Sequence, residues 1–171
     1  MTGGPASTAR SIIAGLSTAG ATVATAESVT AGLVAAELTT VPGSSAVVRG
    51  GVVAYATDLK ESLLQVPGDL LGSVGPVAPE VATRMAEGAR RLLRATYGVA
   101  TTGEAGPDSA TGLPVGTVCI AVAGPASGSV ATVHLPGGRA QVRAGAVGAA
   151  LDLLLEHVAG TAAGPTTPGG A

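Results

Sequence analysis

The sequence predicts one α/β domain, a three-layer α/β/α sandwich around a mixed central sheet. Two observations favour this fold class. Helical and strand-like patterns alternate through the first half of the chain, and three strand-like runs then follow one another before a closing helix. A chain of 171 residues, 46% of them hydrophobic, suits a single domain with a sizeable core.

The first half supplies alternating elements. Apolar periodicity predicts a helix over 7–19, a strand over 22–26, a helix over 33–40 and a strand over 46–55. Gly50 and Gly51 interrupt the second strand and indicate a bulge or a close backbone approach. Asp58 with Glu61 indicates a capping box that opens a short helix ending near Leu64.

The second half begins with a helix that Pro79 starts and that ends near residue 98. Strands are predicted over 99–102, 115–123 and 129–135, and a closing helix over 139–158. Residues 1–6 and 160–171 are rich in Gly, Pro, Thr and Ala without periodicity. We expect them to be disordered tails around a domain at 7–159.

Composition argues against several classes of partner. A net charge of -2 with scattered arginines, and two tyrosines without Phe or Trp, make nucleic acid an unexpected partner. No apolar run approaches ~20 residues and no signal-peptide layout is present, so we expect no membrane association and a cytoplasmic protein. Cys119 lies in an apolar strand and reads as buried packing. The sequence has one cysteine and two histidines, His134 and His157, without the spacing of a metal site. No metal and no cofactor are therefore expected.

The segment 26–32 carries the first chemical signal, because it joins a strand directly to a helix. Such a turn exposes a hydroxyl at a strand end, while the N–H groups of the following helix can bind an anion or an oxyanion. Ser28 is therefore a candidate nucleophile. The alternative is that Ser28 or Thr30 only caps the helix.

The second signal is the use of basic residues: eight of the nine are arginine, and the remaining one is Lys60. Arginine keeps its proton near neutral pH, whereas a desolvated lysine can lose it and act as a base. Tyr55 ends the preceding strand and can line the same pocket. The alternatives are a solvated helix face for Lys60 and an edge-of-core position for Tyr55.

A third signal is the glycine-containing loop at 102–107, which follows a short strand. Glycines let backbone N–H groups approach a ligand closely, although the same composition suits an ordinary turn.

Together these segments match a known family in order and spacing. The matching motifs are Thr25-Ala26-Glu27-Ser28-Val29-Thr30-Ala31-Gly32, Pro42-Gly43-Ser44-Ser45, Gly51-Val52-Val53-Ala54-Tyr55 with Lys60, Ala105-Gly106-Pro107, the Pro114 to Val118 run, and Gly137-Gly138-Arg139 with Arg143. The chain resembles the CinA C-terminal domain family, which also occurs as a free-standing nicotinamide mononucleotide amidohydrolase. The resemblance covers about 7–158 and implies the CinA C-terminal-like α/β/α fold.

The resemblance implies metal-free and cofactor-free hydrolysis of nicotinamide mononucleotide to nicotinic acid mononucleotide and ammonia, in pyridine nucleotide salvage by a homo-oligomer. Ser28 would attack the amide, Lys60 would move its proton, and Tyr55 would orient the amine or relay the proton. N–H groups after Thr30 or in the 103–106 loop would hold the oxyanion. The residues implied around the substrate are Glu27, Thr30, Gly32, Ser44, Ser45, Gly103, Ala105, Gly106, Arg139 and Arg143, with Arg139 as the phosphate fork.

Five positions depart from the family pattern. Val29 replaces a cysteine, Ala31 a glycine, Glu104 an apolar residue, Gly138 an aspartate and Ala78 a serine. Glu104 adds negative charge beside a phosphate-bearing substrate, and Ala31 adds a methyl group at a crowded turn. A catalytically inactive nucleotide-binding or regulatory module is therefore the alternative function. A purely structural oligomerisation module is a third reading.

Overall fold

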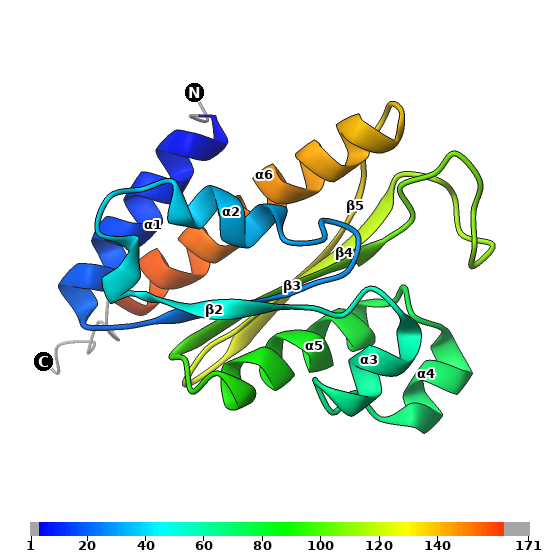
Figure 1. Ribbon diagram of the computed structural model, residues 1–171, viewed down its shortest axis with the longest axis horizontal. Helices are drawn as coiled ribbons and strands as arrows, with labels where there is room; N and C mark the ends of the chain where they lie inside the picture. The colour runs from blue at the N-terminus through cyan, green and yellow to red at the C-terminus, as the bar shows by residue number, and fades with distance from the viewer. Residues whose placement is uncertain (1–3, 163–171) are drawn as a thin grey trace, which may run out of the picture.

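A five-stranded sheet in the order β2-β1-β3-β4-β5 forms the centre of the computed structural model, which describes residues 4–162 (Figure 1). The strands are β1 (Val23–Glu27), β2 (Val48–Val53), β3 (Tyr97–Gly103), β4 (Thr117–Ala123) and β5 (Gly128–His134). β1 pairs in parallel with β2 and β3, whereas β3, β4 and β5 pair antiparallel. The sheet is therefore mixed, as predicted.

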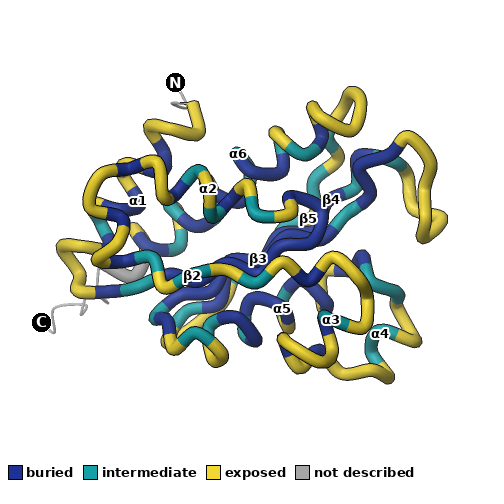
Figure 2. Tube along the Cα trace, viewed as in Figure 1, coloured by how far each residue is buried: buried dark blue, intermediate teal, exposed yellow. Residues whose placement is uncertain are grey.

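Helices cover both faces of this sheet. One layer contains α1 (Pro5–Ala19), α2 (Leu33–Thr39) and α6 (Arg139–Ala162), and the other contains α3 (Thr57–Ser62), α4 (Gly68–Val74) and α5 (Pro79–Leu92). A short 3-10 helix, η1 (Ser44–Ala46), precedes β2. The central strands β1, β3 and β4 are largely buried, whereas the edge strands β2 and β5 alternate between half-buried and exposed residues (Figure 2). The three-layer α/β/α prediction is confirmed.

Alternation along β1 divides its side chains between two cores. Val23 packs with α1, α2 and α6, whereas Ala24 and Ala26 pack with the α5 layer. The small side chains on the second face let α5 approach closely. At Gly98, an added Cβ would meet the carbonyl oxygen of Ala86 in α5. The same alternation places Glu27 on the α2 side and Ser28 on the α3 side.

Element boundaries differ from the predictions at several places. α1 begins at Pro5 rather than at 7, and β2 begins at Val48 because residues 44–46 form η1. The predicted bulge is confirmed, since Val23 pairs with Val48 but Ala24 pairs with Gly50. α5 ends at Leu92 and β3 begins at Tyr97, so the chain turns earlier than expected.

In the layer that contains α3, one local prediction is wrong and one helix was not predicted. The capping box of Asp58 and Glu61 does not form, because the N-cap of α3 is Ala56 and no side chain caps it. The helix α4 was not predicted, and it buries none of its residues. Without a buried face, α4 leaves no apolar periodicity in the sequence.

The tails fall mostly outside the described residues. Of the segments expected to be disordered, residues 1–3 and 163–171 lie outside the described part, while α6 continues through Ala162. Within residues 4–162, no helix has the length and apolarity needed to cross a membrane.

Candidate active site

A cavity of about 250 Å³ lies at the edge of the sheet where the three parallel strands end. Ser28 follows β1, Tyr55 follows β2, and the segment 103–106 ends and follows β3; all of them line the cavity. In the order β2-β1-β3, β2 lies on one side of β1 and β3 lies on the other. The direction in which the chain adds strands therefore changes at β1. Ligands bind at such switch points in α/β sheets, so the topology and the cavity agree.

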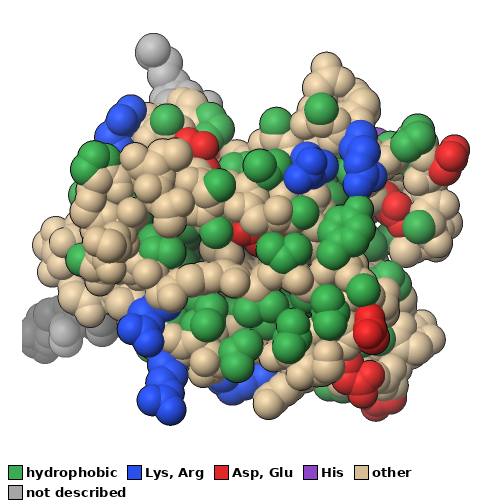
Figure 3. Space-filling view, viewed as in Figure 1, with side chains coloured by type: hydrophobic (Ala, Val, Ile, Leu, Met, Phe, Trp, Pro, Cys, Tyr) green, Lys and Arg blue, Asp and Glu red, His purple; other side chains and the backbone are tan. Residues whose placement is uncertain are grey.

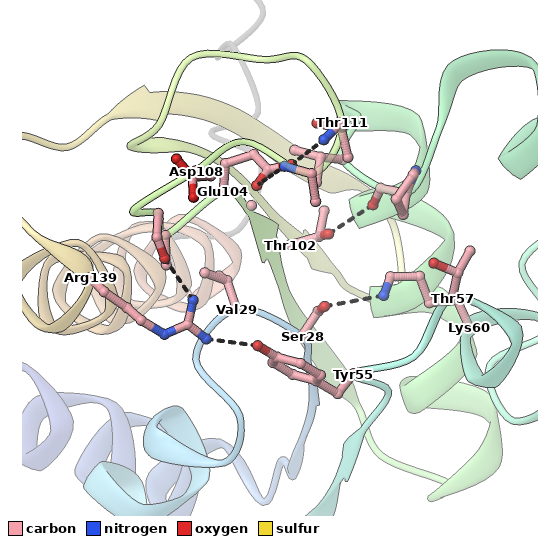
Figure 4. Close-up of a pocket in the computed structure, with 16 residues that line it drawn as sticks. Ser28, Val29, Tyr55, Thr57, Lys60, Thr102, Glu104, Asp108, Thr111 and Arg139 are labelled. Atoms are coloured by element: carbon pink, nitrogen blue, oxygen red, sulfur yellow. Dashed lines mark hydrogen bonds between the residues drawn. The ribbon is translucent and has the colours of Figure 1, made fainter.

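Ser28 and Lys60 meet inside this cavity (Figure 4). The Nζ of Lys60 donates to Ser28 Oγ at 3.1 Å and to the carbonyl of Ala54 at 2.9 Å. Lys60 is only 1% exposed, which excludes the solvated helix face considered from the sequence. Burial lowers the pKa of Lys60 from its usual 10.5 to about 8. The predicted serine and lysine pair is therefore assembled, with a lysine that can lose its proton.

The backbone around Ser28 is fixed from both sides. The N–H of Ser28 donates to the carbonyl of Thr101 at 2.9 Å, which ties the turn to β3. Arg143 donates through Nε to the carbonyl of Val29 at 3.1 Å and through Nη2 to that of Thr30 at 3.0 Å. Arg143 thus holds the turn that carries Ser28, and it does not line the cavity.

Glu27, the last residue of β1, bonds to the N-terminus of α2. Its carboxylate accepts the N–H groups of Gly32, Val34 and Ala35 at 2.8–3.0 Å. It also accepts the hydroxyls of Thr25 at 3.0 Å and Thr30 at 2.7 Å. A carboxylate at a helix N-terminus satisfies donors that the helix cannot. The N-cap position is Gly32, and the side chain that satisfies the N–H groups there is that of Glu27, and not of Ser28 or Thr30.

This arrangement corrects the expected roles of three residues. Glu27, Thr30 and Gly32 were expected around the substrate, but their polar groups bond to one another, and none of the three lines the cavity. The N–H groups at the start of α2 are occupied by Glu27, so they are not available to an oxyanion. Val29 lines the cavity, and its N–H donates to no protein acceptor among the described residues.

Arg139 and Tyr55 form a second pair on the opposite wall of the cavity (Figure 4). Arg139, at the start of α6, donates through Nη1 to the carbonyl of Gly106 at 2.9 Å and through Nη2 to the hydroxyl of Tyr55 at 2.7 Å. Tyr55 is 56% exposed, so it is not part of the core edge. Its hydroxyl accepts a hydrogen bond from Arg139 and makes none with Lys60, so the structure shows no direct contact for the expected orienting of the amine or relay of its proton.

Ser44 and Ser45 lie far from this cavity. Both belong to η1, immediately before β2. Because β1, β2 and β3 are parallel, residues before β2 lie at the amino edge of the sheet, whereas the cavity lies at the carboxyl edge. The expected assistance of these serines in phosphate binding is not supported within one chain.

Two cavity residues have roles that the sequence did not reveal. Thr102 donates through Oγ1 to the carbonyl of Pro76 at 2.8 Å and so joins β3 to the segment before α5. Glu104 is 6% exposed, and its carboxylate accepts the N–H groups of Ala110 and Thr111. The sequence could have indicated both residues, because Thr102 and Glu104 are polar and lie at the carboxyl end of β3, where ligand sites of α/β sheets are commonly found.

Cys119 is a structural residue, and the possible metal ligands among the described residues are scattered. Cys119 is 2% exposed and burial raises the pKa of its thiol, as expected for a packing cysteine. Among the described residues, no three His, Cys, Asp or Glu side chains gather as metal ligands would. Acidic and basic side chains stand close together at the end of the molecule that carries the loop 104–116 (Figure 3).

Comparisons with known proteins agree with this architecture. Residues 5–158 match the family model of the CinA C-terminal domain. A CinA-like protein of Frankia casuarinae is 50% identical over 123 residues, which is 72% of this chain and 28% of that protein. This chain thus spans about a third or less of the length of such relatives.

Solved structures show the same fold. The competence/damage inducible protein CihA from Agrobacterium tumefaciens is 38% identical, with a TM-score of 0.83 over 91% of this chain and 96% of that one. A CinA superfamily protein from Enterobacter cloacae is 27% identical, with a TM-score of 0.89 over 92% of this chain and 94% of that one. Sequence, fold and family match together establish that the chain belongs to the CinA C-terminal domain family.

Proposed function

We propose that the chain hydrolyses the carboxamide of nicotinamide mononucleotide to nicotinic acid mononucleotide and ammonia, in pyridine nucleotide salvage. The observation that carries this proposal is the 3.1 Å contact between Ser28 Oγ and the buried Nζ of Lys60 inside the cavity. This pair supports amide hydrolysis as the reaction class, and the family resemblance of the motifs supports the substrate. The proposal also includes a cytoplasmic location and a homo-oligomeric state.

The first half of the reaction forms an ester. Neutral Lys60 accepts the hydroxyl proton of Ser28 while Oγ attacks the amide carbon. The carbonyl oxygen becomes an oxyanion, for which the N–H of Val29, next to the nucleophile, is the first candidate donor. The ammonium of Lys60 then returns its proton to the amide nitrogen, the C–N bond breaks, and ammonia leaves. Ser28 is left as an ester of the nicotinate carboxyl group.

The second half reverses these roles with water. Lys60, again neutral, takes a proton from a water molecule that attacks the ester carbon. Collapse of the second tetrahedral intermediate releases the nicotinate carboxylate and returns the proton to Ser28 Oγ. The contact between Lys60 and the carbonyl of Ala54 at 2.9 Å keeps Nζ beside the reacting atoms through both halves.

Arg139 is the candidate ligand for the phosphate. Its guanidinium has five N–H donors. One donor on Nη1 bonds to the carbonyl of Gly106 and one on Nη2 bonds to the hydroxyl of Tyr55, and these two bonds orient the group. The remaining donors can form charge-assisted hydrogen bonds to phosphate oxygens. Arg139 comes from α6 and Lys60 from α3, on opposite sides of the cavity, so the substrate would span it from phosphate to amide.

The test is to incubate the purified chain with nicotinamide mononucleotide and to measure ammonia and nicotinic acid mononucleotide. We expect both products in equal amounts from the wild type and neither from Ser28→Ala. Binding of the mononucleotide without release of ammonia would instead support the inactive nucleotide-binding module. Equal release from both proteins would show that the product does not come from this site.

A further inference from the structure

We propose that Glu104 is a positioning residue that holds residues 107–113 as the outer wall of the cavity and thereby sets how tightly the site binds its substrate. The effect on the substrate rests on the hydrolysis proposed above. The effect on the loop is a property of the chain alone, and it can be measured on the free protein.

The wall is a segment with few other attachments. Residues 107–113 are exposed and lie in the loop that projects from the sheet between β3 and β4 (Figure 1). Asp108, Ala110 and Thr111 of this segment line the cavity. The N–H groups of Ala110 and Thr111 donate to the Glu104 carboxylate at 3.2 and 2.9 Å. The segment's other hydrogen bond is internal, from the N–H of Gly112 to Ser109 Oγ at 2.8 Å.

Glu104 itself is firmly anchored. Its N–H donates to the carbonyl of Thr117 at 2.9 Å, and its carbonyl accepts the N–H of Gly116 at 2.7 Å. The side chain therefore extends from the fixed base of the loop towards the two N–H groups, as Figure 4 shows for Glu104 and Thr111. Two bonds of this kind connect a rigid sheet edge to an otherwise exposed segment.

The charge of Glu104 makes this connection stronger. Glu104 is 6% exposed, and among the described residues it forms no ion pair, since the ion pairs there join Arg84 and Arg91 to Glu87. A buried carboxylate without a cation needs hydrogen-bond donors, and bonds to a charged acceptor are stronger than neutral ones. The folded wall supplies these donors. If residues 107–113 moved away, the carboxylate of Glu104 would lose both of its N–H donors, so the need for these donors keeps the segment in place.

The effect on catalysis should appear in binding rather than in chemistry. The carboxylate of Glu104 bonds to Ala110 and Thr111 and not to Ser28 or Lys60, and the pKa of Lys60 is lowered by burial. A loosened wall should raise KM because the substrate loses one side of its cavity. It should leave the pH dependence of kcat unchanged because the base keeps its surroundings.

The test compares Glu104→Leu, which removes both acceptors at similar volume, with Glu104→Gln, which keeps one. Glu156→Gln, on the exposed side of α6, is the matched loss of a carboxylate elsewhere. Hydrogen exchange of the free proteins should be at least about tenfold faster over 107–113 in Glu104→Leu. We expect a smaller increase in Glu104→Gln, no change in Glu156→Gln, and unchanged exchange in β4 for all.

With nicotinamide mononucleotide, Glu104→Leu should raise KM about tenfold while kcat stays within about threefold and its pH profile does not move. Unchanged exchange over 107–113 in Glu104→Leu would overturn the assignment. Faster exchange with an unchanged KM would overturn the role in substrate binding. If the wild type did not hydrolyse the mononucleotide, the proposed function alone would fail, because the exchange comparison needs no substrate.

Discussion

The pH dependence of turnover should report the buried amine of Lys60. With its pKa lowered from 10.5 to about 8, about a tenth of the amine is neutral at pH 7, against about 1 in 3,000 for an ordinary lysine. The fold thus increases the population of the base at pH 7 by about 300-fold. Below pH 8, kcat should rise nearly tenfold per pH unit, and it should level off above about pH 9.

Substitution of Lys60 separates a base from a positive charge. Lys60→Arg keeps the charge but cannot give up a proton at an accessible pH, and Lys60→Met removes the amine at similar length. Both should lower kcat by about 10² to 10⁴, as expected for loss of a general base. Because Lys60 is 1% exposed, the larger arginine can disturb packing, so circular dichroism and the methionine variant serve as controls. An arginine variant that keeps most of the rate, or a flat wild-type profile between pH 6 and 9, would refute the serine–lysine mechanism.

The same shift affects stability. Between about pH 8 and 10.5 the unfolded chain holds the Lys60 proton and the folded chain does not, so the free energy of unfolding should rise with pH in this window. The gain should total about 2 kcal/mol, allowing for screening by water in the cavity. Urea unfolding at pH 7.5 and pH 10 measures it. Lys60→Met should lack this rise, and an equal rise in both proteins would assign it to other groups.

Three further substitutions test individual residues. Ser28→Ala should lower kcat below about one thousandth of the wild type while changing the free energy of unfolding by less than about 2 kcal/mol; ordinary turnover by the folded variant would exclude Ser28 as the nucleophile. Arg139→Ala should raise KM for nicotinamide mononucleotide about tenfold or more, with little effect on nicotinamide riboside, which has no phosphate. Equal losses on both substrates would make Arg139 structural. Glu27→Gln should lower the free energy of unfolding by about 3 kcal/mol in urea, because an amide cannot accept five donors, and a loss below about 1 kcal/mol would contradict the capping role.

The sequence predicted the layers, the mixed sheet and the central pair of the site. The turn after a buried strand marked Ser28, and the lone lysine marked Lys60, because both signals are local and chemically unusual. The alternation of β1 that directs Ser28 towards α3 also follows from the sequence once the strand is recognised.

Other features of the site could not be predicted, because they depend on contacts that form only when the chain is folded. The five partners of Glu27 come from residues up to eight positions away, brought together by a turn whose path the sequence does not specify. Ser44 and Ser45 were grouped with the site by motif order, although residues that precede a parallel strand lie at the edge opposite to those that follow it. Glu104 was noted only as an unusual charge, because its N–H partners lie in a loop without a regular pattern.

The ester on Ser28 is the most direct test of the proposed mechanism. Wild-type protein mixed with nicotinamide mononucleotide, quenched with acid during turnover and digested, can be analysed by mass spectrometry for a nicotinate mononucleotide acyl group. We predict this group on the peptide that contains Ser28 and its absence from Ser28→Ala. Release of ammonia by Ser28→Ala at the wild-type rate, or an acyl group on a different residue, would contradict the central claim that Ser28, activated by Lys60, is the nucleophile.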